Sequence, residues 1–249
     1  MIWRFIETGS NTGQYNMQYD IELAKRAELE KTAFFRLYMW SPYCISLGAN
    51  QKFEDIKLDK AKRDGLDVVK RPTGGRAILH AEEWTYSAAF PTTLGVSSQE
   101  IYRRISLALV RGLKTYDEKL SGAELENIQP DFAEALKRPT GAVCFATAAK
   151  SEVKFKGKKL IGSAQRKMNG AILQHGSLLC GNYHLKLTDY LEADAKEIDF
   201  IKEEMLGKTI DVSQIIGKAV DYYKLKQHLI EGFEAEWEIK LSFQNAESI

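Results

Sequence analysis

Apolar residues recur along the chain with two different periods, which predict strands and helices in turn. The runs 33–40 and 43–47 are rich in aromatic and β-branched residues and predict two strands around the turn at Ser41-Pro42. The apolar positions of 98–114 fall at steps of four, which predicts a helix with one core-facing side. Further strands are predicted at 2–7, 67–71, 77–79, 84–90, 150–155, 159–166, 171–180 and 239–243, and further helices at 14–31, 58–64, 199–206, 212–224 and 229–238.

Together these elements predict an α+β (mixed α/β) fold, with one large, mainly antiparallel sheet flanked by helices. The 249 residues, 44% of them hydrophobic, suffice for one large core, and we expect a single domain over 1–249. The first helix is expected to carry Met17, Ile21, Ala24 and Leu29 broadly on one side. Segment 121–141 has weak periodicity, mixed charge and two prolines, and therefore predicts a long surface loop.

The charge balance excludes several classes of partner. The chain has 35 Lys and Arg against 34 Asp and Glu, so a net charge of +1 provides no overall field to attract nucleic acid or an anionic membrane. No run of about 18 apolar residues predicts a membrane span, and Arg4 and Glu7 interrupt the start of the chain where a signal peptide is apolar. We expect a cytoplasmic protein that binds neither nucleic acid nor membrane.

The three cysteines are Cys44, Cys144 and Cys180, an odd number without a Cys-x-x-Cys pair. This pattern argues against a disulfide framework and against a structural zinc site. The four histidines also lack the spacing of a metal site, so no metal is expected. Cys44 and Cys180 lie in apolar runs and are expected to be small buried hydrophobes.

Cys144 differs because basic and small residues accompany it. A cysteine attacks as its thiolate, and a neighbouring cation increases the ionised fraction at neutral pH. Lys159 is the candidate cation, because a strand ending at Phe155 and a turn at Lys156-Gly157 predict a hairpin that could bring it close to the thiol. The plainer alternatives are a buried thiol for Cys144 and one member of a solvated lysine run for Lys159.

Two glycine-containing segments, 71–76 and 162–164, are candidate ligand contacts. Adjacent glycines let a backbone approach a ligand or adopt positive φ, and flanking arginines could grip a carboxylate or phosphate. Each segment alone is more often structural, as a turn between strands or as a site of close packing. A single histidine such as His80 or His175 is likewise more often a structural group, so only the combination of these motifs is informative.

In their joint order these motifs resemble the lipoate-protein ligase and octanoyltransferase family. The Cys-Phe pair together with Gly-Ser-Ala-Gln is most similar to the cysteine-dependent octanoyltransferases. The implied fold is a biotin/lipoate ligase-like catalytic domain. The motifs that carry the resemblance are Arg71-Pro72-Thr73-Gly74-Gly75-Arg76, Thr85-Tyr86-Ser87, Cys144-Phe145, Gly157-Lys158-Lys159, Gly162-Ser163-Ala164-Gln165 and His175-Gly176-Ser177.

The resemblance implies transfer of an octanoyl group from acyl carrier protein to a lysine of a lipoyl domain, such as the glycine-cleavage H protein, with no cofactor. Cys144 would attack the carrier thioester, and the acceptor amine would then attack the octanoyl-enzyme. Lys159 would lower the pKa of the thiol. The implied substrate-binding residues are Arg71, Gly74, Gly75, Arg76, His80, Gly162, Ser163, Ala164, His175 and Gly176.

Three alternatives remain at this point. An ATP-dependent lipoate-protein ligase would use ATP and Mg²⁺ and leave Cys144 without a role. An amidotransferase would move an octanoyl or lipoyl group between lipoyl domains through the same cysteine. A non-enzymatic module would only bind lipoyl domains or carrier protein. The residues after Cys144-Phe145, Ala146-Thr147-Ala148-Ala149, depart from the family pattern and leave the preferred acyl length open.

Overall fold

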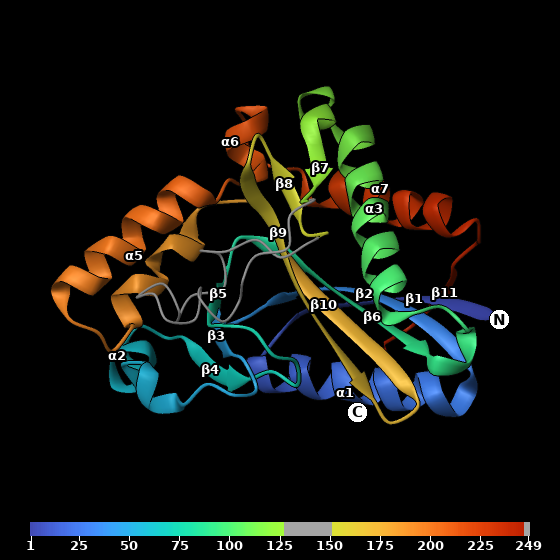
Figure 1. The fold of residues 1–249 in the computed structure, drawn as a ribbon, viewed down its shortest axis with the longest axis horizontal. Coiled ribbons are helices and arrows are strands. Elements are labelled where there is room, and N and C mark those ends of the chain that lie inside the picture. Colours follow the sequence, from blue (N-terminus) through green and yellow to red (C-terminus); the bar gives the residue numbers. More distant parts are fainter. Residues whose placement is uncertain (127–150, 247–249) are drawn as a thin grey trace.

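The computed structural model describes residues 1–126 and 151–246, and its centre is an eight-stranded sheet (Figure 1). Five of its seven neighbouring strand pairs are antiparallel, and the pairs of β1 with β2 and with β11 are parallel. The prediction of an α+β fold with a large, mainly antiparallel sheet is confirmed. In spatial order the strands are β11 (Ser242–Gln244), β1 (Ile2–Asn11), β2 (Thr32–Trp40), β6 (Glu83–Pro91), β10 (Ala171–Leu179), β9 (Lys158–Met168), β8 (Val153–Phe155) and β7 (Ala123–Leu125).

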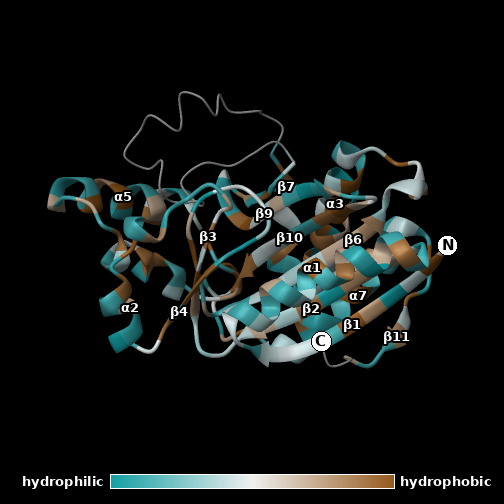
Figure 2. Cartoon of the chain, turned by 90° about the horizontal axis from the view of Figure 1, so that it is seen from below, coloured by the Kyte–Doolittle hydropathy of each residue, from teal (hydrophilic) through white to brown (hydrophobic). Residues whose placement is uncertain are grey.

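Helices cover both faces of this sheet. Helix α1 (Gly13–Glu30) lies across one face, and α3 (Ser98–Tyr116) packs with α7 (Tyr222–Trp237) on the other (Figures 1 and 2). The central strands β6 and β10 are consequently buried at every position. Both strands nevertheless carry polar residues, and burial on both faces means that those polar side chains must be hydrogen-bonded inside the protein.

Helix α1 begins at a capped turn, because the Thr12 hydroxyl accepts a hydrogen bond from the Tyr15 amide at 3.3 Å. Met17 and Ala24 face the sheet as predicted. The prediction for Leu29 is wrong: its side chain is 78% exposed. Leu29 is five positions after Ala24 along the helix, and at about 100° per residue this step places it about 140° away around the helix axis.

A second sheet of three strands lies beside one end of the large one (Figure 1). The sequence predicted its strands but assigned them to the large sheet, because local patterns carry no information on which distant strands pair. This sheet has its own apolar cluster, shared with α2, the 3-10 segment η6 and α5. The elements are β4 (Asp67–Lys70), β3 (Cys44–Leu47), β5 (Ile78–His80), α2 (Leu58–Arg63), η6 (Tyr183–Tyr190) and α5 (Ala195–Lys208).

Two further predictions need correction. The helix predicted at 212–224 is interrupted, because α6 (Val212–Ile216) ends at Gly217 in the left-handed region with φ of 72°, and α7 then begins after the Asp221 cap. The loop predicted at 121–141 contains strand β7 at its start, while 127–141 lies outside the described residues. Short 3-10 segments η1 (Phe53–Asp55), η2 (Thr92–Leu94) and η3 (Glu118–Gly122) complete the described elements.

Helices α3 and α7 cross closely because glycines stand at the contact. A Cβ added at Gly112 would lie 2.6 Å from the His228 carbonyl oxygen and 2.9 Å from Leu229 Cα. Both are backbone atoms, so only a shift of one helix against the other could relieve the overlap. Gly232 of α7 lies against Ala108 and Gly112 from the opposite side.

We therefore expect Gly112→Ala to lower the free energy of unfolding by roughly 1–3 kcal/mol, the usual cost of overpacking a core. Urea or thermal unfolding measures the change. The matched control is Gly207→Ala on α5, where a Cβ meets no atom within 4 Å. The control should be neutral or stabilising by up to about 1 kcal/mol, since alanine favours helix. Equal effects of the two variants would contradict the close crossing.

Candidate active site

A cavity with roughly 330 Å³ of empty space, part of it open to solvent, lies between the large sheet, α1 and the small sheet. Small-molecule sites are typically concave and mainly apolar, with a few polar groups that orient the ligand. The wall of this cavity combines apolar side chains with a few polar ones, which is typical of such sites. The lining residues are Met17, Tyr38, Trp40, Ser46, Arg71, Ile78, His80, Thr85, Gly162, Ser163, Ala164, His175, Gly176 and Ser177.

Most of the predicted substrate-binding residues meet at this cavity although they come from distant parts of the chain. Antiparallel pairing places β9 beside β10, and Ser163 lies opposite Gly176 in the register. A Cβ at Gly176 would come within 2.5 Å of the Gly162 carbonyl oxygen, so the wall requires glycine there. The predicted residues in the wall are Arg71, His80, Gly162, Ser163, Ala164, His175 and Gly176, and the three outside it are Gly74, Gly75 and Arg76.

Those three belong to a turn beside the cavity, which Arg71 holds in shape. The Arg71 guanidinium donates to the carbonyl oxygens of Gly74 at 3.0 Å and Arg76 at 2.7 Å, and to that of Ser46 at 3.0 Å. Gly75 has φ of 94°, which favours glycine. The sequence suggested that Arg71 could grip a carboxylate or phosphate. In the structure its guanidinium lines the cavity and also fixes the backbone of the turn.

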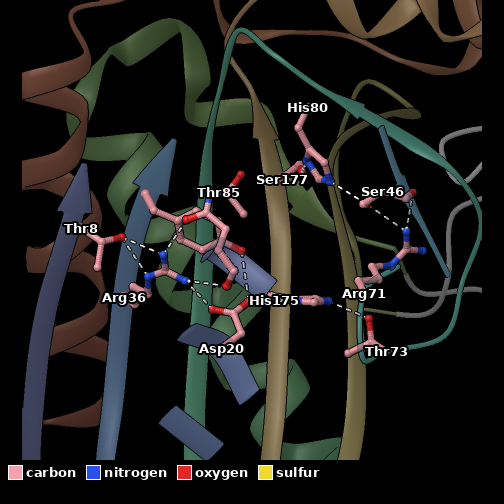
Figure 3. A network of polar contacts seen from close by, with 12 residues as sticks. Thr8, Asp20, Arg36, Ser46, Arg71, Thr73, His80, Thr85, His175 and Ser177 are labelled. Atoms are coloured by element: carbon pink, nitrogen blue, oxygen red, sulfur yellow. Dashed lines mark hydrogen bonds and ion pairs between the residues drawn. The ribbon is translucent and has the colours of Figure 1, made fainter. Parts of the chain in front are cut away.

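A buried ionic network crosses the α1 face of the large sheet (Figure 3). Arg36 pairs with Asp20 at 2.7 Å, and the second Asp20 oxygen accepts from His175 Nδ1 at 2.9 Å and from the Tyr38 hydroxyl at 3.1 Å. His175 Nε2 then accepts from the Thr73 hydroxyl at 2.6 Å, which ties the glycine turn to β10. Burial by itself would raise the pKa of Asp20. The hydrogen bond from His175 and the charge of Arg36 outweigh burial, so the pKa of Asp20 lies below its usual value. Burial lowers the pKa of His175.

A second network with the same order of groups surrounds His80. Its Nδ1 lies 2.8 Å from Glu83 Oε1. Its Nε2 lies 2.7 Å from the Ser46 hydroxyl, as Figure 3 shows. The hydroxyls of Ser177, at 2.8 Å, and Thr85 also donate to Glu83 Oε1. Burial raises the pKa of Glu83, but His80 and these hydrogen bonds outweigh it and the pKa is lowered overall.

The sequence analysis missed the charged members of both networks. Asp20 and Arg36 are fully buried, and Glu83 is 1% exposed. A signal was available: Arg36 interrupts the otherwise apolar run 33–40, and a charge inside a strand buried on both faces needs a partner. The identity of the partner depends on tertiary packing and could not be inferred.

Lys159 is buried, unlike its solvent-exposed neighbour Lys156. Its ammonium lies 2.9 Å from Glu152 Oε2, and Glu152 Oε1 accepts the Ser163 amide at 3.2 Å. Lys159 is therefore not part of the solvated run, and its counter-ion also binds the cavity wall. The predicted hairpin is confirmed as β8, the turn and β9. Cys144 lies outside the described residues.

The other two cysteines are buried, as expected. Burial raises the pKa of both Cys44 and Cys180, so neither thiol ionises near neutral pH. Within 1–126 and 151–246, no three or more His, Cys, Asp or Glu side chains are grouped to hold a metal ion. No helix in this part of the chain has the length and apolar character needed to cross a bilayer.

Comparison with known proteins identifies the family. The family described as "Lipoyl protein ligase A/B catalytic domain" matches residues 12–234, and the chain belongs to it. Similar curated proteins are named "Octanoyltransferase LipM", with 32% identity in Macrococcus caseolyticus, 34% in Clostridioides difficile and 35% in Kyrpidia tusciae. The alignments cover 96%, 96% and 93% of this chain and 88%, 88% and 85% of the relatives.

Solved structures show the same fold. Lipoate-protein ligase A bound with ATP superposes with a TM-score of 0.78, and protein Ta0514 of T. acidophilum with bound lipoic acid superposes with 0.74. Each is 18% identical, and each alignment covers 99% of this chain and 90% of the other. The implied lipoate ligase-like fold is thereby confirmed.

The buried pair of Arg36 and Asp20 leads to a pH-dependent prediction. Asp20→Asn should lower the free energy of unfolding by roughly 3–5 kcal/mol at pH 7, because it leaves Arg36 buried without its counter-ion. The pKa of Asp20 is lowered in the folded state, so the stability it provides is present above its unfolded pKa of about 3.9 and is lost as pH falls through the folded value. Unfolding of both proteins between pH 7 and pH 3 should show this difference shrinking in acid. A difference independent of pH would contradict an ionised Asp20.

Proposed function

We propose that the protein is an octanoyltransferase of lipoate biosynthesis, which moves an octanoyl group from acyl carrier protein to a lysine of a lipoyl domain such as the glycine-cleavage H protein. The observation that carries this proposal is the 32–35% identity to relatives named octanoyltransferase over 93–96% of the chain. The described cavity supports it, because the sequence motifs typical of the family surround a partly apolar space.

The apolar part of the wall suits the hydrocarbon tail. Met17, Trp40 and Ile78 contribute apolar side chains to the lining. Ala164 and the glycines Gly162 and Gly176 also line the cavity and add little side-chain volume. At about 0.8 kcal/mol per buried methylene, a seven-carbon tail gains up to about 5 kcal/mol. That affinity orients the acyl group and still permits release of the product.

The proposed chemistry has two steps. The Cys144 thiolate attacks the thioester carbonyl of the carrier, a new carbon–sulfur bond forms, and the carrier thiol leaves. The amine of the acceptor lysine then attacks this octanoyl-enzyme to form an amide and to release the cysteine. In this scheme the Lys159 cation favours the thiolate, and Glu152 links that cation to Ser163 in the cavity wall.

The first test is the covalent intermediate. Incubation with octanoyl-acyl carrier protein, without ATP, should add one octanoyl group, visible by intact mass and removed by hydroxylamine. Cys144→Ser should abolish this thioester adduct while the fold is retained. An adduct that forms only with free octanoate and ATP would indicate a ligase. Transfer from an octanoylated lipoyl domain, but not from carrier protein, would indicate an amidotransferase.

A second test concerns Lys159. Substitution of Lys159 alone would remove the counter-ion of the buried Glu152 carboxylate, so the informative variant is the double change Lys159→Met with Glu152→Gln. We expect it to fold and to form the octanoyl-enzyme roughly 10- to 100-fold more slowly at pH 7, since one or two units in the thiol pKa change the thiolate fraction by that factor. Rapid alkylation of Cys144 across pH measures the thiol pKa directly. An unchanged alkylation profile would remove Lys159 from the mechanism.

A further inference from the structure

Transfer to a lysine requires the removal of a proton. A free lysine side chain has a pKa of about 10.4, so fewer than about one molecule in a thousand carries a neutral amine at pH 7. Only the neutral amine has the electron pair that attacks a carbonyl carbon. A group in the cavity that takes this proton would therefore accelerate the second step of the proposed function, on which this inference rests.

Two chains of a carboxylate, a histidine and a hydroxyl reach the cavity, one through His175 and one through His80 (Figure 3). In both chains the carboxylate accepts from Nδ1, which leaves Nε2 to accept a proton from the hydroxyl. The two chains look alike in geometry. They differ in the charge that surrounds the carboxylate, and this difference assigns them different roles.

In the His175 chain, the carboxylate of Asp20 is already balanced by the positive charge of Arg36. Asp20 is paired with Arg36, and both side chains are completely buried. Protonation of His175 would add a second cation beside a carboxylate that needs only one. Burial holds the pKa of His175 below its usual value, so this histidine remains a neutral link to the glycine turn.

The His80 chain lacks such a cation. Across the described residues no lysine or arginine pairs with Glu83, and Glu83 Oε2 is buried there without a hydrogen-bond partner. His80 is thus the ion-pair partner that the described residues offer to Glu83, alongside the hydroxyls of Thr85 and Ser177. Trp40 stacks on the imidazole at a centroid distance of 4.1 Å. The Arg71 guanidinium lies 3.1 Å from Ser46 Oγ, and Tyr38 in the same wall stays neutral because burial raises its pKa.

We propose that His80, paired with Glu83 and reached through the Ser46 hydroxyl, accepts the proton that the acceptor lysine must lose before it attacks the octanoyl group. Arg71 donates to Ser46 Oγ, so the hydrogen of the hydroxyl itself points to His80 Nε2. Ser46 lines the cavity, and in this proposal its hydroxyl receives the proton of the incoming ammonium.

The proton balance of the step is simple. The ammonium gives a proton to Ser46 Oγ while the hydroxyl proton moves to His80 Nε2, which leaves a neutral amine and an imidazolium facing Glu83. The amine nitrogen bonds to the thioester carbon, the carbon–sulfur bond breaks with its electron pair on sulfur, and the remaining excess proton on nitrogen neutralises the thiolate. His80 releases its proton to solvent before the next turnover.

The test compares two nucleophiles on the isolated octanoyl-enzyme. The first is a lipoyl domain with its acceptor lysine, and the second is hydroxylamine, which is already unprotonated at neutral pH and needs no base. In His80→Gln we expect single-turnover transfer to the lysine to fall by roughly 10²- to 10⁴-fold at pH 7, the usual contribution of a general base. Cleavage by hydroxylamine, corrected for cleavage of the denatured octanoyl-enzyme, should keep its wild-type rate.

His175→Gln is the matched control, because it makes the same chemical change in the other chain. It disturbs the turn through Thr73 and should slow both nucleophiles by the same factor. Equal losses for both nucleophiles in His80→Gln, or no loss, would overturn the proposal. A wild-type protein that never forms an octanoyl-enzyme would overturn the proposed function itself and, with it, this step.

A measurement on the wild-type protein covers the case in which His80→Gln does not fold. The rate of transfer to lysine should rise with pH and level off well below pH 10.4, whereas an amine that ionises unaided gains about tenfold per pH unit up to that value. The hydroxylamine reaction should not show the same inflection. A wild-type rate that climbs tenfold per unit through the whole range would also overturn the proposal.

Discussion

The positive charge of the buried Arg36 must be balanced inside the protein, and the side chains that balance it connect the central elements of this fold. Arg36 lies on β2 with no exposed surface, and a guanidinium in that position is tolerated only when charge and hydrogen bonds surround it. Its partners come from different elements: Thr8 from β1 and Asp20 from α1. Asp20 in turn binds His175 on β10, and His175 binds Thr73 in the glycine turn. A single ionic constraint thus fixes the helix, three strands and the turn relative to one another.

The same constraint separates the roles of the two histidines. Where an arginine already balances the carboxylate, the histidine is left to make hydrogen bonds, and its value is positional. At Glu83, where no lysine or arginine of the described residues pairs with the carboxylate, His80 is the ion-pair partner at 2.8 Å, and this geometry underlies the role proposed for it. The His175 and His80 chains have nearly the same hydrogen-bond distances. They differ in that Arg36 pairs with the carboxylate of the first chain only, so the hydrogen-bond distances alone would not distinguish them.

The sequence predicted the class of fold and most elements because those depend on local periodicity. The hairpin before Lys159 and the close approach of segment 162–164 to His175 follow from turn chemistry and the resemblance of motifs. The separate three-stranded sheet did not follow, since strand pairing is settled by packing between distant segments. For the same reason the hydrogen bonds from Arg71 to the carbonyl oxygens of its own turn could not be inferred from the sequence.

Arg36 and Lys159, two of the buried cationic residues in the described part of the chain, show how residue type matches role. Arg36 uses the rigid planar fork of its guanidinium to bind several elements at once, and a compact ammonium could not replace that geometry. Lys159 carries a point charge on a flexible stem, held by Glu152 behind the cavity wall. In the proposed mechanism the ammonium turns from its carboxylate toward the thiolate or the thioester oxygen, which a guanidinium bonded in a fixed plane could not do. The arginine thus suits the scaffold, and the lysine suits the role proposed for it.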